Sequence, residues 1–385
     1  MNVKSDFREV RKTAFEKYKE TPVRDRKHGL HIKTKLDFLN LEEIEVNEEQ
    51  TIKIEQEELE KQGKVKLLTG NQIENSDLPG IDKVKQHLFE YFKNFPKEKE
   101  KIEYLHEAVS KVNLIYIKPE VSTKETIFIR NQLKENCFNH NFIYIGKHSN
   151  VNVFYETNNE GEGIGTDYTQ VLLDEGAKAT VVNCKDLTND YFLYSKNLNI
   201  TEKDSDLQLV TSDFGGKMII NESRVKLNGN NSKTNTNNIY YTVNGERYDL
   251  SCTSEHEGKH TYSLLNAKGA AKSSKALVRG LVKINKYAEE SDGYQQSDAL
   301  LMDEKAHVTS IPDLEIQNEK VRCSHGSTLS RLEEDKIFYI QSRGMDKTEA
   351  ERQLVLGFFH PAIEQIPSEE VRNILQEKLL ERIRK

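Results

Sequence analysis

The chain has 385 residues, a formal net charge of -7 and a mean hydropathy of -0.74. A single core rarely grows beyond about 250–300 residues, so this length predicts one elongated domain with appendages or two to three domains. The acidic balance argues against a general binder of nucleic acid or anionic membranes, because such binders carry a basic excess. The sequence lacks a run of about 18 apolar residues and an apolar N-terminal leader, so we expect a cytoplasmic protein.

The cysteines are few and far apart. Cys137, Cys184, Cys252 and Cys323 form no C-x-x-C pair. This spacing argues against a zinc ribbon, a ferredoxin-type cluster motif and a dithiol redox motif. In a reducing compartment we expect four free thiols.

The first part of the chain, residues 1–105, is predicted to be a mixed helical N-terminal domain. Ser5 can cap a first helix whose apolar residues recur at 3.6-residue spacing up to Tyr18. A second helix is expected from Asp82. Between these helices, residues 40–70 alternate acidic and apolar residues without a clear period.

A core of short strands is predicted from 106 to 328. Apolar runs such as residues 114–117, 142–145 and 239–243 are separated by Gly, Asn, Asp and Ser, often every 8–12 positions. This spacing is typical of a β-sandwich, a barrel or a parallel β-helix. Residues 172–181 resemble residues 301–310 in pattern, and a repeated strand-turn-strand unit of this kind favours a solenoid.

The last part of the chain, residues 329–385, is predicted to be a C-terminal helical domain. Gly344 can end one helix, Asp346 or Thr348 can begin the next, and Pro367-Ser368 opens the last. These helices, whose apolar stripes include Phe358, Phe359 and Leu375, either cap the strands or dock a partner, and the residues alone favour neither role.

His256-Glu257-Gly258-Lys259-His260 matches the H-E-x-x-H pattern of zinc proteases. That chemistry requires a helix, in which both histidines share one face. This segment is rich in strand and turn formers, and residues four apart on a strand lie about 13 Å from each other. We therefore expect no zinc at His256 and His260. The sequence also contains no phosphate-binding P-loop, so we expect no ATP hydrolysis by this chain alone.

Cys323-Ser324-His325 is a second candidate. On an extended strand Cys323 and His325 project from the same face with Cα atoms about 6.6 Å apart. A thiolate and an imidazole are ligands suited to iron or zinc. Two ligands do not fill a coordination sphere, however, and by spacing alone such a pair is more often a buried thiol beside a hydrogen-bonded histidine.

Three strings near the C-terminus resemble the signature of the SufB/SufD family: SDGYQQSDALLMDEKAHVTSIPDLEI, VRCSHGSTLSRLEEDKIFYIQSRGMD and EAERQLVLGFF. The resemblance implies a mainly β fold, a right-handed parallel β-helix core flanked by N-terminal and C-terminal helical domains. It implies a non-catalytic scaffold of the SUF system for iron-sulfur cluster assembly, with the C-terminal helices bound to the SufC ATPase. It further implies a nascent Fe-S cluster or iron, held transiently and shared with SufB, and leaves a flavin in the complex open.

Within the family, Cys323-Ser324-His325-Gly326 is similar to the Cys-Ser-His-Gly string of SufD-type chains. The SufB-type sulfur-accepting cysteine lies in a Gln-Cys-Asp string, and this chain has Ser297 there. The resemblance therefore implies a SufD-like chain that pairs with SufB through its β-helix, with His325 and Cys323 as tentative cluster or iron ligands. A SufB-like or self-pairing scaffold, including a homodimer of the free chain, remains an alternative within the family. A polysaccharide-active β-helix enzyme is an alternative outside it.

Overall fold

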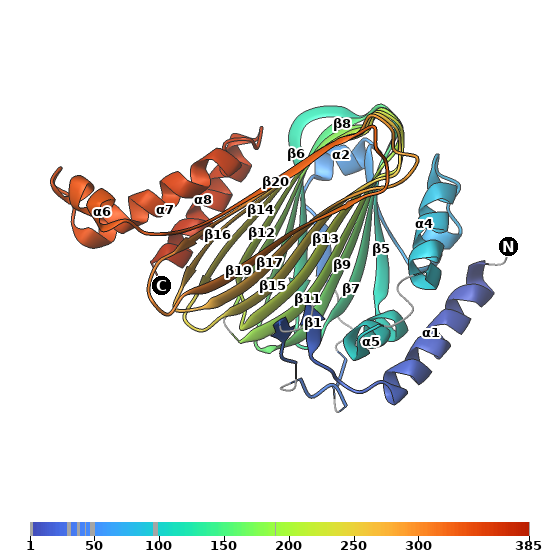
Figure 1. The fold of residues 1–385 in the computed structure, drawn as a ribbon. Helices are drawn as coiled ribbons and strands as arrows, with labels where there is room; N and C mark the ends of the chain where they lie inside the picture. Colours follow the sequence, from blue (N-terminus) through green and yellow to red (C-terminus); the bar gives the residue numbers. More distant parts are fainter. Residues whose placement is uncertain are drawn as a thin grey trace.

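A computed structural model of the protein describes residues 3–28, 32–36, 39–42, 44–46, 51–94, 99–188 and 190–384. The chain coils into a solenoid whose strands stack into two mostly parallel sheets. Helices flank the solenoid at both ends (Figure 1). The mainly β class and the parallel β-helix are as predicted. In the described part of the chain, no helix combines the length and apolarity needed to cross a membrane.

Sheet I contains β3 and the even-numbered strands from β6 to β20. Its order is β20-β18-β16-β14-β12-β10-β8-β6-β3, and all neighbours are parallel except β3 and β6. The strands are β3 (Thr51–Ile54), β6 (Ser122–Leu133), β8 (Asn150–Asn159), β10 (Lys178–Leu187), β12 (Asp206–Gly215), β14 (Lys233–Val243), β16 (Tyr262–Lys272), β18 (Asp292–Leu301) and β20 (Arg322–Arg331).

Sheet II contains the strands that alternate with these along the chain. Its order is β19-β17-β15-β13-β11-β9-β7-β5-β4, with β4 antiparallel to β5. The strands are β4 (Val65–Thr69), β5 (Lys111–Ile117), β7 (Phe138–Ile145), β9 (Gly163–Leu173), β11 (Tyr191–Thr201), β13 (Met218–Leu227), β15 (Arg247–His256), β17 (Lys275–Ile284) and β19 (His307–Ile316).

The corner that leads from sheet II to sheet I repeats once per rung. At each turn one residue has a left-handed backbone conformation, and these residues recur about every 28 positions. The backbone N–H of this residue donates to a carbonyl of the next rung, as His148 does to Glu175 and His260 does to Glu289. The stacked corner residues are Glu120, His148, Gly176, Asp204, Asn231, His260 and Glu290.

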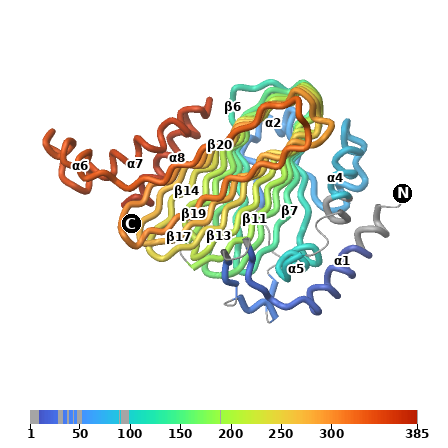
Figure 2. Tube along the Cα trace, viewed as in Figure 1, coloured from blue at the N-terminus to red at the C-terminus, as the bar shows by residue number. Residues whose placement is uncertain are grey.

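Most of the N-terminal region covers the outer face of sheet II (Figure 2). The elements there are α1 (Val3–Glu20), the hairpin β1 (Arg26–His28) and β2 (Ile32–Thr34), α3 (Asn71–Glu74), α4 (Ile81–Asn94) and α5 (Lys101–Val109). The short helix α2 (Glu57–Lys61) instead packs Leu59 into the lumen at the end of the solenoid. Leu36, Val84 and Leu105 pack with Phe192 and Met218 of the sheet in one buried cluster. Because α1 begins at Val3, Ser5 lies inside the helix, and its predicted role as the cap is wrong.

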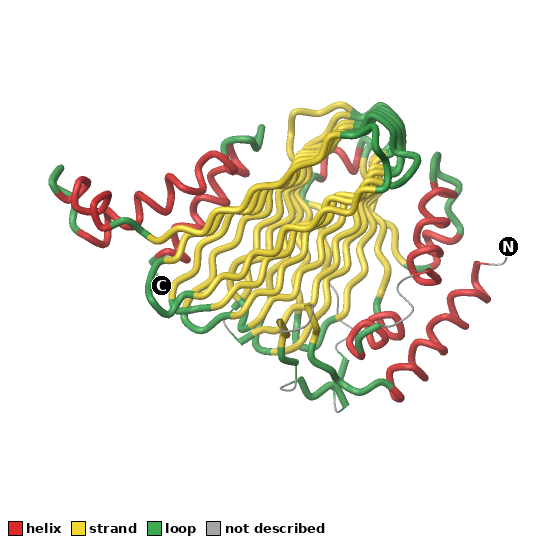
Figure 3. Tube along the Cα trace, in the orientation of Figure 1, coloured by secondary structure: helices red, strands yellow, loops and turns green. Residues whose placement is uncertain are grey.

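The C-terminal helices α6 (Glu334–Gln341), α7 (Lys347–Ile363) and α8 (Glu369–Ile383) flank sheet I (Figure 3). Two predicted helix starts are confirmed. The Asp346 side chain accepts from the N–H of Glu349 at 2.8 Å, and Ser368 accepts from Val371 at 3.4 Å. Gly344 follows α6 with φ +96°, a conformation that favours glycine.

Candidate functional site

The two ends of the solenoid differ. Antiparallel β3 and β4 close the first end, whereas β19 and β20 are the edge strands at the other end and pair with one neighbour each within their sheets. An unpaired strand edge presents free backbone N–H and C=O groups and favours pairing with another chain. In the described part of the chain, the last rung is therefore the open end of the β-helix.

β20 carries the predicted Cys-x-His pair at this open end. Its register with β18 continues the row of side chains that faces the lumen, in which Gln295 is buried. The register partners are Gly293 with Cys323, Gln295 with His325, Ser297 with Ser327, and Ala299 with Leu329. Cys323 and His325 thus lie on one face, and His325 and Leu329 are exposed because no further rung covers them.

Hydroxyl groups connect the three last strands beside His325. Ser310 Oγ of β19 donates to Ser297 Oγ of β18 at 2.9 Å, and Ser327 Oγ of β20 donates to Ser310 Oγ at 3.1 Å. Under His325, Gln295 Nε2 donates to the carbonyl of Asp313 at 2.9 Å. These hydrogen bonds hold in place the side chains next to the His325 imidazole.

Cys323 is a half-buried free thiol that packs against Val282, Ile284 and Ala288. Burial, with a smaller effect of Asp292, raises the pKa of this thiol. The group is therefore a thiol at neutral pH until a cation or a partner lowers that pKa. In the described residues, no group of three or more His, Cys, Asp or Glu side chains forms a metal site. Cys323 and His325 alone would not fill a coordination sphere.

The other three cysteines are buried. Burial raises the pKa of Cys137, and it raises the pKa of Cys184 and of Cys252 to about 12. A protonated, inaccessible thiol is a poor nucleophile and a poor ligand. Cys323 is the one cysteine that solvent reaches.

The H-E-x-x-H segment lies on a strand and a turn, as its residues predicted. His256 ends β15 and faces the lumen, where its ring nitrogens lie 2.7 Å from Thr261 Oγ1 and 2.8 Å from Ser263 Oγ. Burial lowers the pKa of His256 to about 4, so the ring is neutral. His260 lies at the stacked corner and contacts Glu290 at 3.1 Å. The two imidazoles therefore have separate partners.

The predicted docking residues of the C-terminal helices fall mostly in the core. Phe359 and Leu375 are buried against sheet I, and Phe358 is half-buried. The exposed aromatic side chains of this region are Phe338, with 72% of its surface exposed, and Tyr339, with 59%. Both lie on α6, which extends beyond the sheet (Figure 1).

A family model described as "SUF system FeS cluster assembly, SufBD core domain" matches residues 128–358, more than half of the chain. The chain belongs to this SufBD family. Members of the family are scaffold components of iron-sulfur cluster assembly. The matched range contains most of the β-helix and the whole open end.

Three relatives place the chain within the SufBD family. It is 32% identical over 174 residues to chloroplastic protein ABCI7 of Arabidopsis thaliana and 31% over 146 residues to SufD of Escherichia coli. It is 24% identical over 201 residues to SufB of Bacillus subtilis. These alignments cover 45%, 38% and 52% of this chain, and the chain spans 37%, 34% and 43% of the respective relatives.

Sequence reasoning identified Cys323 and His325 but missed their surroundings. Ser310 and Gln295 belong to strands that precede the Cys-x-His string by 13 and 28 positions, and no local pattern connects them to it. The local rung length of 30 residues, which separates the corner residues His260 and Glu290, is what stacks Gln295 under His325.

Proposed function

We propose that this SufBD protein is a SufD-like, non-catalytic scaffold that pairs with SufB and with the SufC ATPase. The observation that carries the proposal is the open end of the β-helix. There, unpaired strand edges and an incomplete N/S ligand set lie on the same rung. A partner that continues the solenoid would pair with the edges and add the missing ligands.

In this proposal the Fe-S cluster is assembled on the complex and passed on, and it is not a resident cofactor of this chain. His325 supplies an imidazole, and Cys323 supplies a thiol that loses its proton when iron binds. The remaining ligands come from SufB across the interface. Sharing the sphere between two chains lets the assembled cluster leave when the interface opens, since neither chain alone holds it.

The SufD assignment is supported by Ser297. Its hydroxyl accepts a hydrogen bond from Ser310, and a hydroxyl forms no persulfide. Sulfur acceptance therefore belongs to the partner's cysteine. The likeness to SufD of E. coli, at 31% identity, agrees with this assignment.

SufC docking is assigned to the C-terminal helices. Phe359 and Leu375 hold α7 and α8 on sheet I, and the exposed Phe338 and Tyr339 of α6 offer an apolar contact. Movement of SufC on ATP binding would then reach the open end through β20, because only residues 332 and 333 separate β20 from α6.

Co-expression with SufB and SufC, followed by affinity purification, tests the pairing. Leu329→Arg places a charge in the exposed, lumen-facing row of β20, whereas Thr328→Arg places the same charge on the outer face of the same strand. We expect Leu329→Arg to lose SufB and Thr328→Arg to retain it. Retention of SufB by both variants would contradict pairing through the open end. A wild-type chain that captures only its own copies would favour the self-pairing scaffold.

A further inference from the structure

A groove of about 510 Å³ lies on the outer face of sheet II, where the hairpin of β1 and β2 ends. Lys33 and Lys35 line it from the hairpin side, and Arg247, Lys275 and His307 line it from the sheet. No carboxylate lines this groove within the described ranges. It lies outside the lumen that the row of β20 faces, and nothing in the cluster-scaffold role uses it.

Arg247, Lys275 and His307 form a row across three strands. Each stands at the first position of its strand, and the register pairs Arg247 with Lys275 and Lys275 with His307. Paired strands lie about 4.8 Å apart, so the row repeats a positive or protonatable group at that interval. All three side chains are exposed.

The corresponding row of sheet I has a different charge pattern. There the first positions of β10, β12 and β14 are Lys178, Asp206 and Lys233, in register. Two cations flank a carboxylate there, so opposite charges lie side by side within the row. The uncompensated row is thus a property of sheet II rather than of strand starts in general.

Several other cations that project from sheet II have carboxylate partners. Lys283 contacts Glu255 at 3.1 Å, and Arg279 contacts Asp249 at 3.8 Å. Arg247, Lys275, Lys33 and Lys35 make no ion pair with any described residue. Asp249, which neighbours Arg247, is engaged by the hydroxyl of Thr34 at 2.8 Å and by Arg26 and Arg279.

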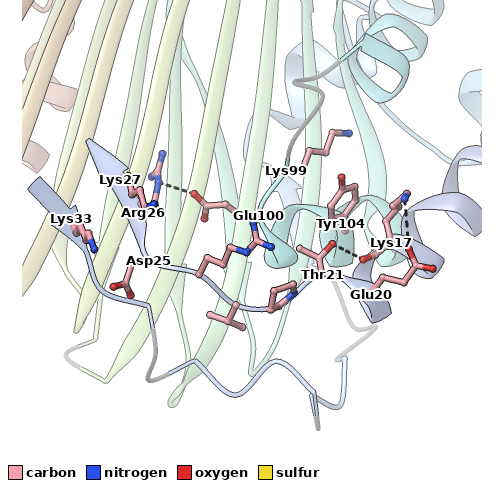
Figure 4. Close-up of a pocket in the computed structure, with 13 residues that line it drawn as sticks. Lys17, Glu20, Thr21, Asp25, Arg26, Lys27, Lys33, Lys99, Glu100 and Tyr104 are labelled. Atoms are coloured by element: carbon pink, nitrogen blue, oxygen red, sulfur yellow. Dashed lines mark hydrogen bonds and ion pairs between the residues drawn. The ribbon is translucent and has the colours of Figure 1, made fainter. Parts of the chain in front are cut away.

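A larger neighbouring cleft, of about 930 Å³, shares Lys33 but differs in charge (Figure 4). Its lining includes Glu20, Asp25 and Glu100, and Arg26 Nε lies 2.9 Å from Glu100 Oε1. These carboxylates offset part of the positive charge of the cleft, whereas no described carboxylate lines the smaller groove.

We propose that this groove binds a small polyanion that carries two or more phosphoryl groups. Guanidinium and ammonium groups are preferred partners of phosphoryl oxygens, and the row presents them at neighbouring positions. The volume fits a small molecule rather than a polymer. The net charge of -7 argues against nucleic acid.

Isothermal titration of the purified chain with sodium tripolyphosphate tests the proposal. We expect saturable binding that weakens as salt rises and that falls about tenfold or more in Arg247→Gln/Lys275→Gln. Lys233→Gln, which removes an exposed strand-start cation of sheet I, should bind as the wild type does. Circular dichroism of each variant verifies the fold.

Pyrophosphate and ADP distinguish the two sources of such a group. Tighter binding of ADP would assign the groove to a nucleotide, and equal binding would assign it to free phosphate chains; either result supports the phosphoryl class. Absence of tripolyphosphate binding at millimolar concentration would overturn the proposal. An equal loss in Lys233→Gln would also overturn it, because the effect would then reflect overall charge.

Discussion

Phe359→Ala tests whether the C-terminal helices are part of the folded core. Phe359 is fully buried between α7 and sheet I, with ring centroids 6.5 Å from Tyr241 and 5.1 Å from Phe358. Truncation of a buried Phe to Ala costs about 3–5 kcal/mol, because transfer free energy is lost and a cavity remains. A typical domain has only about 5–15 kcal/mol of stability. We therefore expect Phe359→Ala to remove a large share of it.

Urea unfolding followed by far-ultraviolet circular dichroism measures this loss. Phe338→Ala is the matched control, because the same truncation on the exposed face of α6 should change stability by less than about 0.5 kcal/mol. Its effect should instead appear as weaker capture of SufC. A Phe359→Ala protein as stable as the wild type would refute the packing of α7 on sheet I.

Three further predictions concern the β-helix itself. Burial disfavours ionised Glu222, but Lys196 and Arg26 together outweigh it and lower its pKa to about 2. We expect Glu222→Gln to cost about 2 kcal/mol at pH 7. Because the pKa of folded Glu222 lies below the usual 4.5, the loss of unfolding free energy in Glu222→Gln should shrink as the pH falls from about 5 toward 2. A loss that stays constant with pH in urea unfolding would contradict this. Gly269→Ala should destabilise the protein by about 1–3 kcal/mol, since the added Cβ would lie 1.7 Å from Tyr240 Cζ. Gly357→Ala on α7 is the control, because its added Cβ meets open space. Equal melting temperatures of the two variants would reject the packing of β16 on β14. Metal analysis should find zinc below stoichiometry, and stoichiometric zinc that disappears in His256→Ala would reverse our interpretation of that segment.

The sequence predicted the β-helix because its strands are short, apolar and regularly interrupted. It did not reveal the length of the rung. The corner position needs a left-handed backbone, yet His148, Asp204, Asn231 and Glu290 fill it as well as glycine does. The two similar segments, 172–181 and 301–310, span opposite corners: one leads from β9 to β10 and the other from β18 to β19. Their similarity reflects turn chemistry rather than one stacked position.

The N-terminal segment of residues 40–70 was ambiguous for a physical reason. β3 and β4 are short antiparallel edge strands, and each joins a sheet whose other strands come from later in the chain. Their pairing depends on partners at 113–117 and 129–132, so no local pattern specifies it.

The site was predictable only in part. Cys323 and His325 are two positions apart on one strand, and alternation alone places them on one face. Amphipathic periodicity correctly marked Phe359 and Leu375 as apolar contacts, but an apolar stripe that packs on a sheet and one that docks a partner have the same pattern. Burial in the fold distinguishes them, and it points to Phe338 and Tyr339 for docking.

Cluster maturation by a His325→Ala chain, co-expressed with SufB and SufC, tests the central claim most directly. Ser324→Ala, which changes the adjacent residue on the outer face of β20, is the control. We predict that both variants purify as three-protein complexes, and that only His325→Ala fails to mature clusters in cells. Normal maturation by His325→Ala would contradict the role of this histidine at the open end, and a complex that falls apart would assign His325 to the interface instead.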